Sequence, residues 1–386
     1  MPMKVTINKT LSETMGEIAI CVYIILTVAI AASFSVSAGA SEAEKEPNGP
    51  RVEENGTIHV PAFDLPVSAF LSVETRTALE RQRKEFEQLV ELCSFSTGAD
   101  EDVVANRKCL VKHYYPAIIG KYRAHYKVTI KPETIAGVLT EIITPVEGIS
   151  NSNRQRVLIN LHGGSFKYGG RWGGQAESIP IAAIGKIKVV SVDYRMAPEH
   201  RFPAASEDVA TVYEALLKDY PPENIGIYGC SAGGKLTAQV VAWLQKEGLP
   251  APGAIGIFCA GAANNGRDGD SIHIGSALEG RNLVGRHEQK NSYLYGANLD
   301  SPLVYPSVSS EVMAKFPPSL LISSSRDFNS TAAIVTHAQL VRLGVEADLH
   351  VWEGLDHGFF INPDLPESLE VYEVIVKFFD MKLGKL

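Results

Sequence analysis

The sequence lacks the short motifs from which metal sites and nucleic-acid partners are usually inferred. Its 386 residues include five cysteines but no C-x-x-C pair and no H-E-x-x-H, so neither a structural nor a catalytic zinc is indicated. A basic run is also missing, since Lys and Arg are spread along a chain whose net charge is −8. This charge argues against nucleic acid as a partner. The composition, 45% hydrophobic and 21% charged, is otherwise that of an ordinary globular protein.

The N-terminus has the features of a secretory signal. Residues 18–32 contain no charged side chain, Lys4 and Lys9 precede them, and Ala38–Ala40 reads Ala-Gly-Ala. A basic start, a short apolar core and an A-x-A end predict a signal peptide that is cleaved after Ala40, and hence a secreted or periplasmic protein. The alternative is a retained membrane anchor, because residues 33–37 extend the apolar run toward the length of a membrane span.

Four of the five cysteines lie beyond this signal segment. Cys93 and Cys109 fall in one polar, helical region, so in an oxidising compartment they are the expected disulfide pair. Cys230 and Cys259 lie in apolar segments, and we expect both to be buried thiols.

The pattern of the chain changes twice after the signal. A segment rich in Ser, Glu, Pro, Asn and Gly is followed by an amphipathic helical pattern over residues 72–92, where Phe86 and Leu89 lie on one stripe. Residues 126–130 and 138–144 then alternate as the strands of a hairpin. We therefore expect four regions: a signal peptide or anchor at 1–40, a linker at 41–61, a helical cap segment at 62–120 and a catalytic domain at 121–386.

The rest of the chain alternates short apolar runs with helical patterns. Val209, Val212, Tyr213 and Leu216, for example, keep the spacing of a helix that packs by one face. Strands that alternate with helices predict an α/β fold with a mostly parallel, doubly wound sheet, whose ligands bind at the carboxyl ends of the strands. The strand-like runs are 157–161, 188–193, 225–228, 254–258, 320–323 and 347–352.

One loop between such a strand and a helix carries a nucleophile motif. Gly229–Gly233 reads Gly-Cys-Ser-Ala-Gly and separates the apolar run 225–228 from a helix-forming run at 235–246. This is the strand–turn–helix context of the G-x-S-x-G elbow, in which Ser231 would be exposed on a strained turn. The same letters almost fit a phosphate-binding P-loop, but Leu236 stands where that motif needs Ser or Thr.

Three further loops at strand ends contain residues suited to the same chemistry. His162–Phe166 is a glycine-containing loop whose backbone N–H groups could bind an oxyanion. Asp327 and His357 follow two later strands, and the order Ser231, Asp327, His357 is the one expected of a triad on this frame. Singly, Asp327 could be a helix cap and His357 a loop histidine.

These motifs make the sequence resemble the hormone-sensitive lipase family of α/β-hydrolases, with its bacterial carboxylesterases and arylacetamide-deacetylase-like enzymes. The likeness extends from about residue 126 to the C-terminus, and it includes the run 193–205, which we interpret as structural, as we do Asp208. The resemblance implies an α/β-hydrolase fold with an N-terminal helical cap. It also implies an esterase that works through an acyl-enzyme without cofactor or metal.

The resemblance also assigns roles to the site residues. Ser231 would be the nucleophile, His357 the general base and Asp327 its orienting partner. The oxyanion would be bound by backbone N–H groups among Gly163, Gly164, Ser165 and Ala232. Two departures from the family occur here: Ser165 replaces the usual third glycine, and Asp327 lies in Asp-Phe-Asn-Ser-Thr instead of Asp-Pro-x-x-Asp.

The expected partner is a small carboxylic ester, and a homodimer is compatible with the sequence. We expect short- to medium-chain substrates, because the cap segment is short, mixes its large apolar side chains with many charges and should close a modest apolar pocket over Ser231. A ligand-binding receptor on the same fold is the main alternative, and a hydrolase that uses Cys230 as nucleophile is a second. The cap side chains in question are Phe63, Leu65, Phe70, Leu71 and Tyr114.

Overall fold

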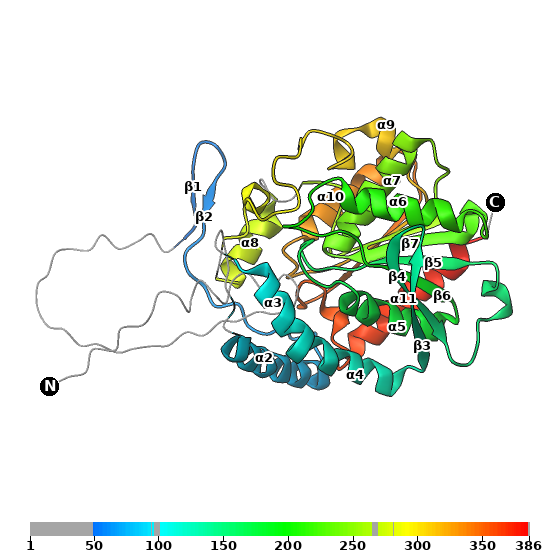
Figure 1. The fold of residues 1–386 in the computed structure, drawn as a ribbon. Coiled ribbons are helices and arrows are strands. Elements are labelled where there is room, and N and C mark those ends of the chain that lie inside the picture. Colours follow the sequence, from blue (N-terminus) through cyan, green and yellow to red (C-terminus); the bar gives the residue numbers. More distant parts are fainter. Residues whose placement is uncertain (1–48, 94, 96–100, 265–268, 281, 385–386) are drawn as a thin grey trace, which may run out of the picture.

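The computed structural model describes residues 49–93, 95, 101–264, 269–280 and 282–384 (Figure 1). The predicted signal peptide at 1–40 lies outside this part of the chain, as does the first part of the predicted linker. The described part of that linker contains two short antiparallel strands that the sequence did not suggest, β1 (Arg51–Val52) and β2 (Ile58–His59). None of the helices within these bounds is long and apolar enough to cross a bilayer.

An eight-stranded sheet forms the centre of the protein, in the order β10-β9-β8-β7-β5-β6-β4-β3. The hairpin β3–β4 and the pair β4–β6 are antiparallel, and every other neighbouring pair in this sheet is parallel. The predicted α/β fold with a mostly parallel sheet is therefore confirmed. The strands are β3 (Val128–Ile135), β4 (Val138–Pro145), β5 (Val157–Leu161), β6 (Lys188–Val192), β7 (Ile225–Cys230), β8 (Ala254–Phe258), β9 (Ser319–Ser324) and β10 (Ala347–Trp352).

Helices cover both faces of this sheet (Figure 1). Successive side chains of a strand point to opposite faces, so Ile159 packs in the apolar cluster under α6, α7 and α10 while Leu158 packs in the one under α5 and α11. Each fully buried aliphatic side chain stabilises the fold by roughly 1.5–3 kcal/mol. The helices are α5 (Trp172–Gly185), α6 (Ala204–Leu216), α7 (Ala232–Glu247), α8 (Asp270–Leu278), α9 (Ser310–Met313), α10 (Ser330–Arg342) and α11 (Pro366–Lys382).

The region predicted as a helical cap, 62–120, is helical from Val73 onward but not over residues 62–72, and its last helix continues to His125. These helices lie outside α5 and α11 (Figure 1). Tyr122 of α4 anchors them, because its hydroxyl lies 2.5 Å from that of Tyr372 in α11 and donates to the Ile361 carbonyl at 2.9 Å. A disulfide joins Cys93 to Cys109 and closes the connection between the first two helices. The helices are α2 (Val73–Cys93), α3 (Val103–Cys109), a π-helical turn (Leu110–Tyr114) and α4 (Tyr115–His125).

The run interpreted as structural connects β6 to α6. The backbone N–H of Arg195 and its guanidinium both donate to Asp208 of α6, at 2.8 Å each. The connection is therefore tied to the helix it precedes.

Two glycines allow the start of α7 to lie directly against the end of β5. A Cβ atom on Gly233 would lie 1.7 Å from the carbonyl oxygen of Leu161, and one on Gly229 would lie 2.1 Å from the same atom. No side chain can occupy these positions without moving the backbone of β5. The closeness of helix and strand thus explains both glycines of the G-x-S-x-G motif.

We predict that Gly233→Ala destabilises the protein by at least about 1–3 kcal/mol, because the new methyl group must displace the β5 backbone. Thermal unfolding of the purified variant measures this. Gly120→Ala in α4 is the matched control: nothing lies within 4 Å of a Cβ there, and Gly120 is exposed. Its expected effect is a gain of up to about 1 kcal/mol from helix propensity. Equal melting temperatures for the two variants would contradict the packing argument.

Candidate active site

Ser231 stands on the sharp turn between β7 and α7. Its backbone has φ 56° and ψ −116°, a strained conformation that residues other than glycine rarely adopt. The turn is held in place because the Ser231 N–H donates to the Phe258 carbonyl of β8 at 2.8 Å. The strained geometry presents the hydroxyl at the carboxyl edge of the sheet, as the elbow motif requires.

His357 and Asp327 lie beside Ser231 although they are far from it in sequence. His357 Nε2 is 2.8 Å from Ser231 Oγ, and His357 Nδ1 is 2.6 Å from Asp327 Oδ1. Asp327 follows β9 and His357 follows β10, so the parallel sheet brings both loops to the same edge. The ring of Phe328 stacks on the imidazole with centroids 4.0 Å apart and restricts its rotation.

The surroundings of Asp327 favour its ionised form. Burial by itself raises the pKa of this carboxyl, but the His357 ring and two hydrogen bonds outweigh burial and hold the pKa below its ordinary value. The hydrogen bonds come from the Asn329 N–H and the Ser323 hydroxyl, at 2.8 Å each. An anion is therefore fixed against Nδ1, which orients the imidazole and stabilises its protonated form.

The four N–H groups predicted to bind an oxyanion differ in the structure, because only that of Gly163 has an acceptor in the described chain. The Gly163 N–H donates to the Glu177 carboxylate at 2.7 Å, so it is already occupied. The N–H groups of Gly164, Ser165 and Ala232 have no acceptor within the described chain. Ser165 has φ 55°, a region that favours glycine, which explains why the family usually carries glycine there.

Glu177, on α5, links the two loops that meet at Ser231. One of its oxygens accepts from Gly163 N–H; the other accepts from Cys230 N–H at 3.3 Å and from the Asn160 amide at 3.1 Å. Burial raises the pKa of this carboxyl to about 8, although the three donors oppose the shift. One buried side chain thus fixes the glycine loop relative to the nucleophile turn.

His162, the first residue of the glycine loop, is a packing residue. Burial lowers its pKa to about 4, so the imidazole is neutral at pH 7. It stacks on Tyr194 with centroids 4.2 Å apart, and the Tyr194 hydroxyl donates to the His162 carbonyl at 2.6 Å. Near the triad, burial also raises the pKa of Asp356 to about 7. Neither residue reaches Ser231 by a hydrogen bond that the structure records.

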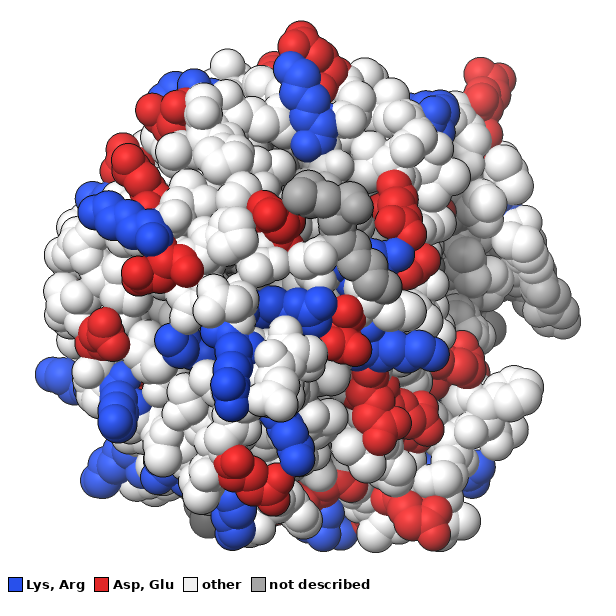
Figure 2. Space-filling view, turned by 90° about the vertical axis from the view of Figure 1, so that its right-hand side faces the viewer, with Lys and Arg blue, Asp and Glu red and all other residues white. Residues whose placement is uncertain are grey.

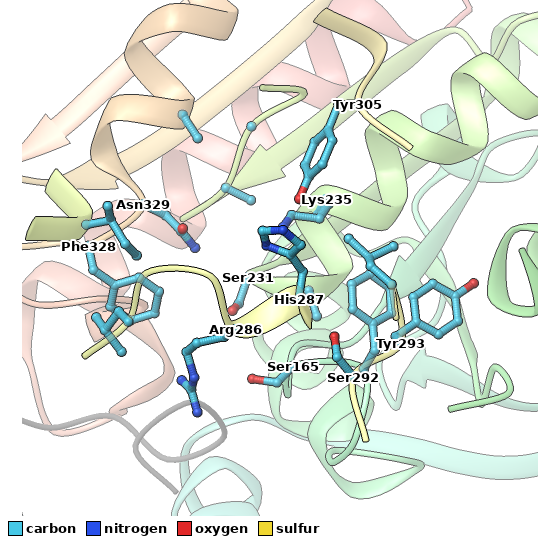
Figure 3. Close-up of a pocket in the computed structure, with 18 of the residues that line it drawn as sticks. Ser165, Ser231, Lys235, Arg286, His287, Ser292, Tyr293, Tyr305, Phe328 and Asn329 are labelled. Atoms are coloured by element: carbon cyan, nitrogen blue, oxygen red, sulfur yellow. The ribbon is translucent and has the colours of Figure 1, made fainter. Parts of the chain in front are cut away.

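Two cavities of different size open at Ser231. The smaller, about 30 Å³, is also lined by His357, Gly164 and Tyr114 and has room for a water molecule or two. The larger, about 170 Å³, is lined by the nucleophile turn and by residues between 260 and 305, among them Tyr293 and Tyr305 (Figure 3). Of these two cavities, only the larger has the volume for a small organic molecule.

The prediction that the large cap side chains close an apolar pocket over Ser231 is wrong in part. Phe63 and Phe70 are 72% and 89% exposed, Leu65 is exposed too, and none of the three lines either cavity. Leu71 is buried, but against the apolar core. Of the five, only Tyr114 lines a cavity that touches Ser231. The segment between β8 and β9 supplies most of the wall of the larger cavity, and the loops after β5 and β9 and the start of α7 supply the rest.

The triad region also contains a cluster of potential metal ligands. Cys259, Asp327 and His357 are the one group of three potential metal ligands found in the described part of the chain. The Cys259 Sγ already accepts from the Gly358 N–H at 3.1 Å, and the other two side chains bond to each other. Burial raises the pKa of the Cys259 thiol and disfavours the thiolate that a metal requires. Cys230 is likewise buried, on β7 before the turn.

The sequence reasoning missed Glu177 and Phe328. A signal for Glu177 was present, because it is the only charged residue in α5, whose other residues include many apolar ones. Such a lone charge in a helix that packs on a sheet indicates a buried group with partners. Phe328 carries no comparable signal, since its stacking depends on where the next strand places His357.

A family model described as alpha/beta hydrolase fold matches residues 158–361. Among curated proteins, the chain is similar to LipR of Mycobacterium tuberculosis, 35% identical over 127 residues, which is 33% of this chain and 40% of LipR. It is similar to an acetyl-hydrolase of Streptomyces hygroscopicus, 27% identical over 239 residues, which is 60% of this chain and 77% of that protein. The matched region thus spans less than half of LipR.

Two solved structures are also similar. Esterase E25 superposes with a TM-score of 0.69 at 27% identity and covers 86% of this chain and 100% of its own. An esterase from the bacterial hormone-sensitive lipase family superposes with a TM-score of 0.65 at 25% identity and covers 78% of this chain and 99% of its own.

We predict that Glu177→Gln lowers kcat/KM by roughly 10- to 100-fold at pH 9, where the Glu177 carboxylate is ionised, because one amide oxygen cannot accept from donors on both sides of it. Steady-state kinetics on a p-nitrophenyl ester measures it. Glu133→Gln, an exposed change in β3, is the matched control and should leave the rate unchanged. A wild-type rate in Glu177→Gln would show that the link between the loops is dispensable.

The same variant tests the pKa of Glu177. Its pKa in the folded protein, about 8, lies above the ordinary value of 4.5, so the unfolded chain releases this proton at lower pH. The stability that depends on protonated Glu177 is fully present below pH 4.5 and is lost as the pH rises through 8. Relative to Glu177→Gln, the wild-type free energy of unfolding should therefore decrease across this window in urea titrations. A constant difference would show that Glu177 is ionised throughout.

Proposed function

Because this chain belongs to the alpha/beta hydrolase fold family, we propose that it is a serine carboxylesterase that hydrolyses short- to medium-chain carboxylic esters. The observation that carries the proposal is the continuous hydrogen-bonded line from Ser231 through His357 to Asp327, with separations of 2.8 and 2.6 Å. Both are hydrogen-bond distances, as expected for a nucleophile that is activated by a general base and for a base that is oriented by a third group. The names of the similar proteins, esterases and an acetyl-hydrolase, agree with this chemistry.

The first half of the reaction transfers the acyl group to the protein. His357 Nε2 takes the proton of Ser231 as Oγ attacks the ester carbonyl, and the carbonyl oxygen becomes an oxyanion. In this proposal the N–H groups of Gly164, Ser165 and Ala232 donate to that oxyanion, which is supported by their having no acceptor within the described chain. The positive end of the α7 dipole lies beside it and adds to the stabilisation. The protonated His357 then gives its proton to the leaving alcohol.

The second half returns the protein to its starting state. Water, activated by His357, attacks the acyl-enzyme and releases the acid. The cavity of about 30 Å³ beside Ser231 and His357 has the size to hold such a water, while the acyl group occupies the larger cavity. Asp327 stays ionised in both halves and stabilises the protonated imidazole.

We also propose that the protein acts outside the cytoplasm. The N-terminal segment 1–40 has the pattern of a secretory signal, and the disulfide between Cys93 and Cys109 is typical of an oxidising compartment. The receptor alternative lacks a specific observation in its favour. A protein that only bound a ligand would not need the hydrogen bonds that join Ser231, His357 and Asp327 here.

We predict that Ser231→Ala lowers the esterase rate by more than about a hundredfold while thermal unfolding stays close to wild type, because removing a triad serine eliminates the nucleophile. Initial rates with p-nitrophenyl butyrate measure it. Ser310→Ala, an exposed serine at the start of α9, is the control and should retain the full rate. A Ser231→Ala protein that keeps most of the wild-type rate would require another nucleophile.

We predict that kcat/KM rises or stays level from acetyl to about hexanoyl esters and falls for longer acyl groups. Each buried methylene gains up to about 0.8 kcal/mol, but only while the wall of the cavity of about 170 Å³ remains to meet it. A series of p-nitrophenyl esters from acetate to palmitate gives the profile. An optimum at dodecanoyl or longer would identify a lipase instead.

A further inference from the structure

The wall of the larger cavity carries charge of one sign. Lys167, Lys235, Arg286 and His287 line it, and no Asp or Glu does among the lining residues that the structure describes. The chain as a whole has 44 acidic residues and 36 Lys or Arg residues, so the excess of basic side chains in this lining is the reverse of the excess in the whole chain. On the face turned away from α8 and α3, by contrast, acidic and basic side chains are interspersed (Figure 2).

The four cationic or titratable groups are not equivalent. Lys167 is neutralised, because its ammonium forms a buried ion pair with Glu101 at 2.7 Å. Arg286 and His287 lie in a short 3-10 turn and take part in further interactions of their own. Lys235 is different: its ammonium lies 5.2 Å from the centre of the Tyr305 ring, and no carboxylate of the described chain lies within ion-pair distance of it. The inference rests on Lys235.

Lys235 is held at a definite place relative to the nucleophile. It lies in the first turn of α7, and its backbone N–H donates to the Ser231 carbonyl at 3.0 Å. Four residues of helix advance about 6 Å along the axis. The side chain is half-buried and extends into the cavity beside Tyr305 (Figure 3). A half-buried ammonium that lies over an aromatic face and has no carboxylate partner in the described chain retains hydrogen-bond donors for a ligand.

We propose that the substrate of this site is an ester that carries a carboxylate a few carbons from the reacting carbonyl, and that Lys235 binds this carboxylate. The inference rests on the proposed esterase function and adds the chemical class of the substrate. The N-terminal end of the α7 dipole adds positive potential at the same place. A neutral ester of the same shape gains only apolar contact here, whereas the carboxylate also gains a charge-assisted hydrogen bond.

Two pairs of substrates of matched shape test the proposal. In the first, the carboxylate is on the acyl side: mono-p-nitrophenyl glutarate is compared with p-nitrophenyl 5-methylhexanoate. In the second, it is on the alcohol side: 4-butyryloxybutanoate is compared with 4-methylpentyl butyrate, with acid release followed by titration. We expect the anionic member of one pair to have a kcat/KM roughly 10- to 100-fold higher, the range of a hydrogen bond to a charged group. Added NaCl should reduce the ratio.

Three variants assign the preference to Lys235. Lys235→Met keeps the length of the side chain and removes the charge, so the anionic-to-neutral ratio should fall toward one. Lys235→Arg keeps the charge and should retain most of the ratio. Lys218→Met, an exposed change in the loop after α6, alters the net charge equally and should leave the ratio at its wild-type value.

Two results would overturn the proposal: a wild-type ratio at or below one in both pairs, or a Lys235→Met ratio equal to that of the wild type. The esterase function is judged separately by the neutral esters. If these are not hydrolysed, Lys235 can still be tested by binding. Calorimetry then measures the affinity of the amide glutaric acid monoanilide for the wild type and for Lys235→Met. Equal affinities would then count against the carboxylate site.

Discussion

The backbone contact between α7 and β5 determines where every other part of the site can lie. Gly233 and Gly229 leave no room for a side chain between the first turn of the helix and the Leu161 carbonyl. The nucleophile turn is thereby pressed against the loop that follows β5, and Ser231 is forced into a positive φ. The strain at Ser231 persists because the surrounding strands over-determine it.

Glu177 converts this contact into a rigid site. The contact brings two loops together, each with N–H groups that point inward, and some of these groups would be left without acceptors inside the protein. A carboxylate from α5 accepts from both loops, at Gly163 and at Cys230. An unsatisfied buried donor costs about 1–3 kcal/mol, so the network stabilises the arrangement of the two loops.

The two sides of the nucleophile turn have different chemistry. Toward the N-terminal helices, Ser231 faces a small cavity with glycines, Tyr114 and His357. Toward the segment between β8 and β9 it faces a larger cavity with aromatic walls and the Lys235 ammonium. Space for water therefore lies on one side and space for a substrate on the other, a division that suits an acyl transfer followed by hydrolysis.

The sequence by itself determined the architecture and the residues that meet at the site. Apolar runs of strand length predicted β5 and β8 to the residue, because buried parallel strands have a strong local signal. The strand-like run 347–352 also matched β10, an edge strand whose residues alternate between exposed and half-buried along most of its length. Ser231, Asp327 and His357 were identifiable because each follows a strand, and the carboxyl ends of parallel strands converge. The motif resemblance to the hormone-sensitive lipase family is confirmed by the family match and by the similar solved structures.

Only the tertiary structure decided which groups within those loops are free to act. Gly163 and Gly164 are indistinguishable as letters, and the difference between them arises from Glu177, a residue on another helix. Most of the wall of the larger cavity comes from the segment between β8 and β9 and none of it from the large cap side chains Phe63 and Phe70, which are exposed. Local periodicity encodes helices and strands, whereas hydrogen-bond partners and cavity walls depend on contacts between distant segments, which no local pattern records.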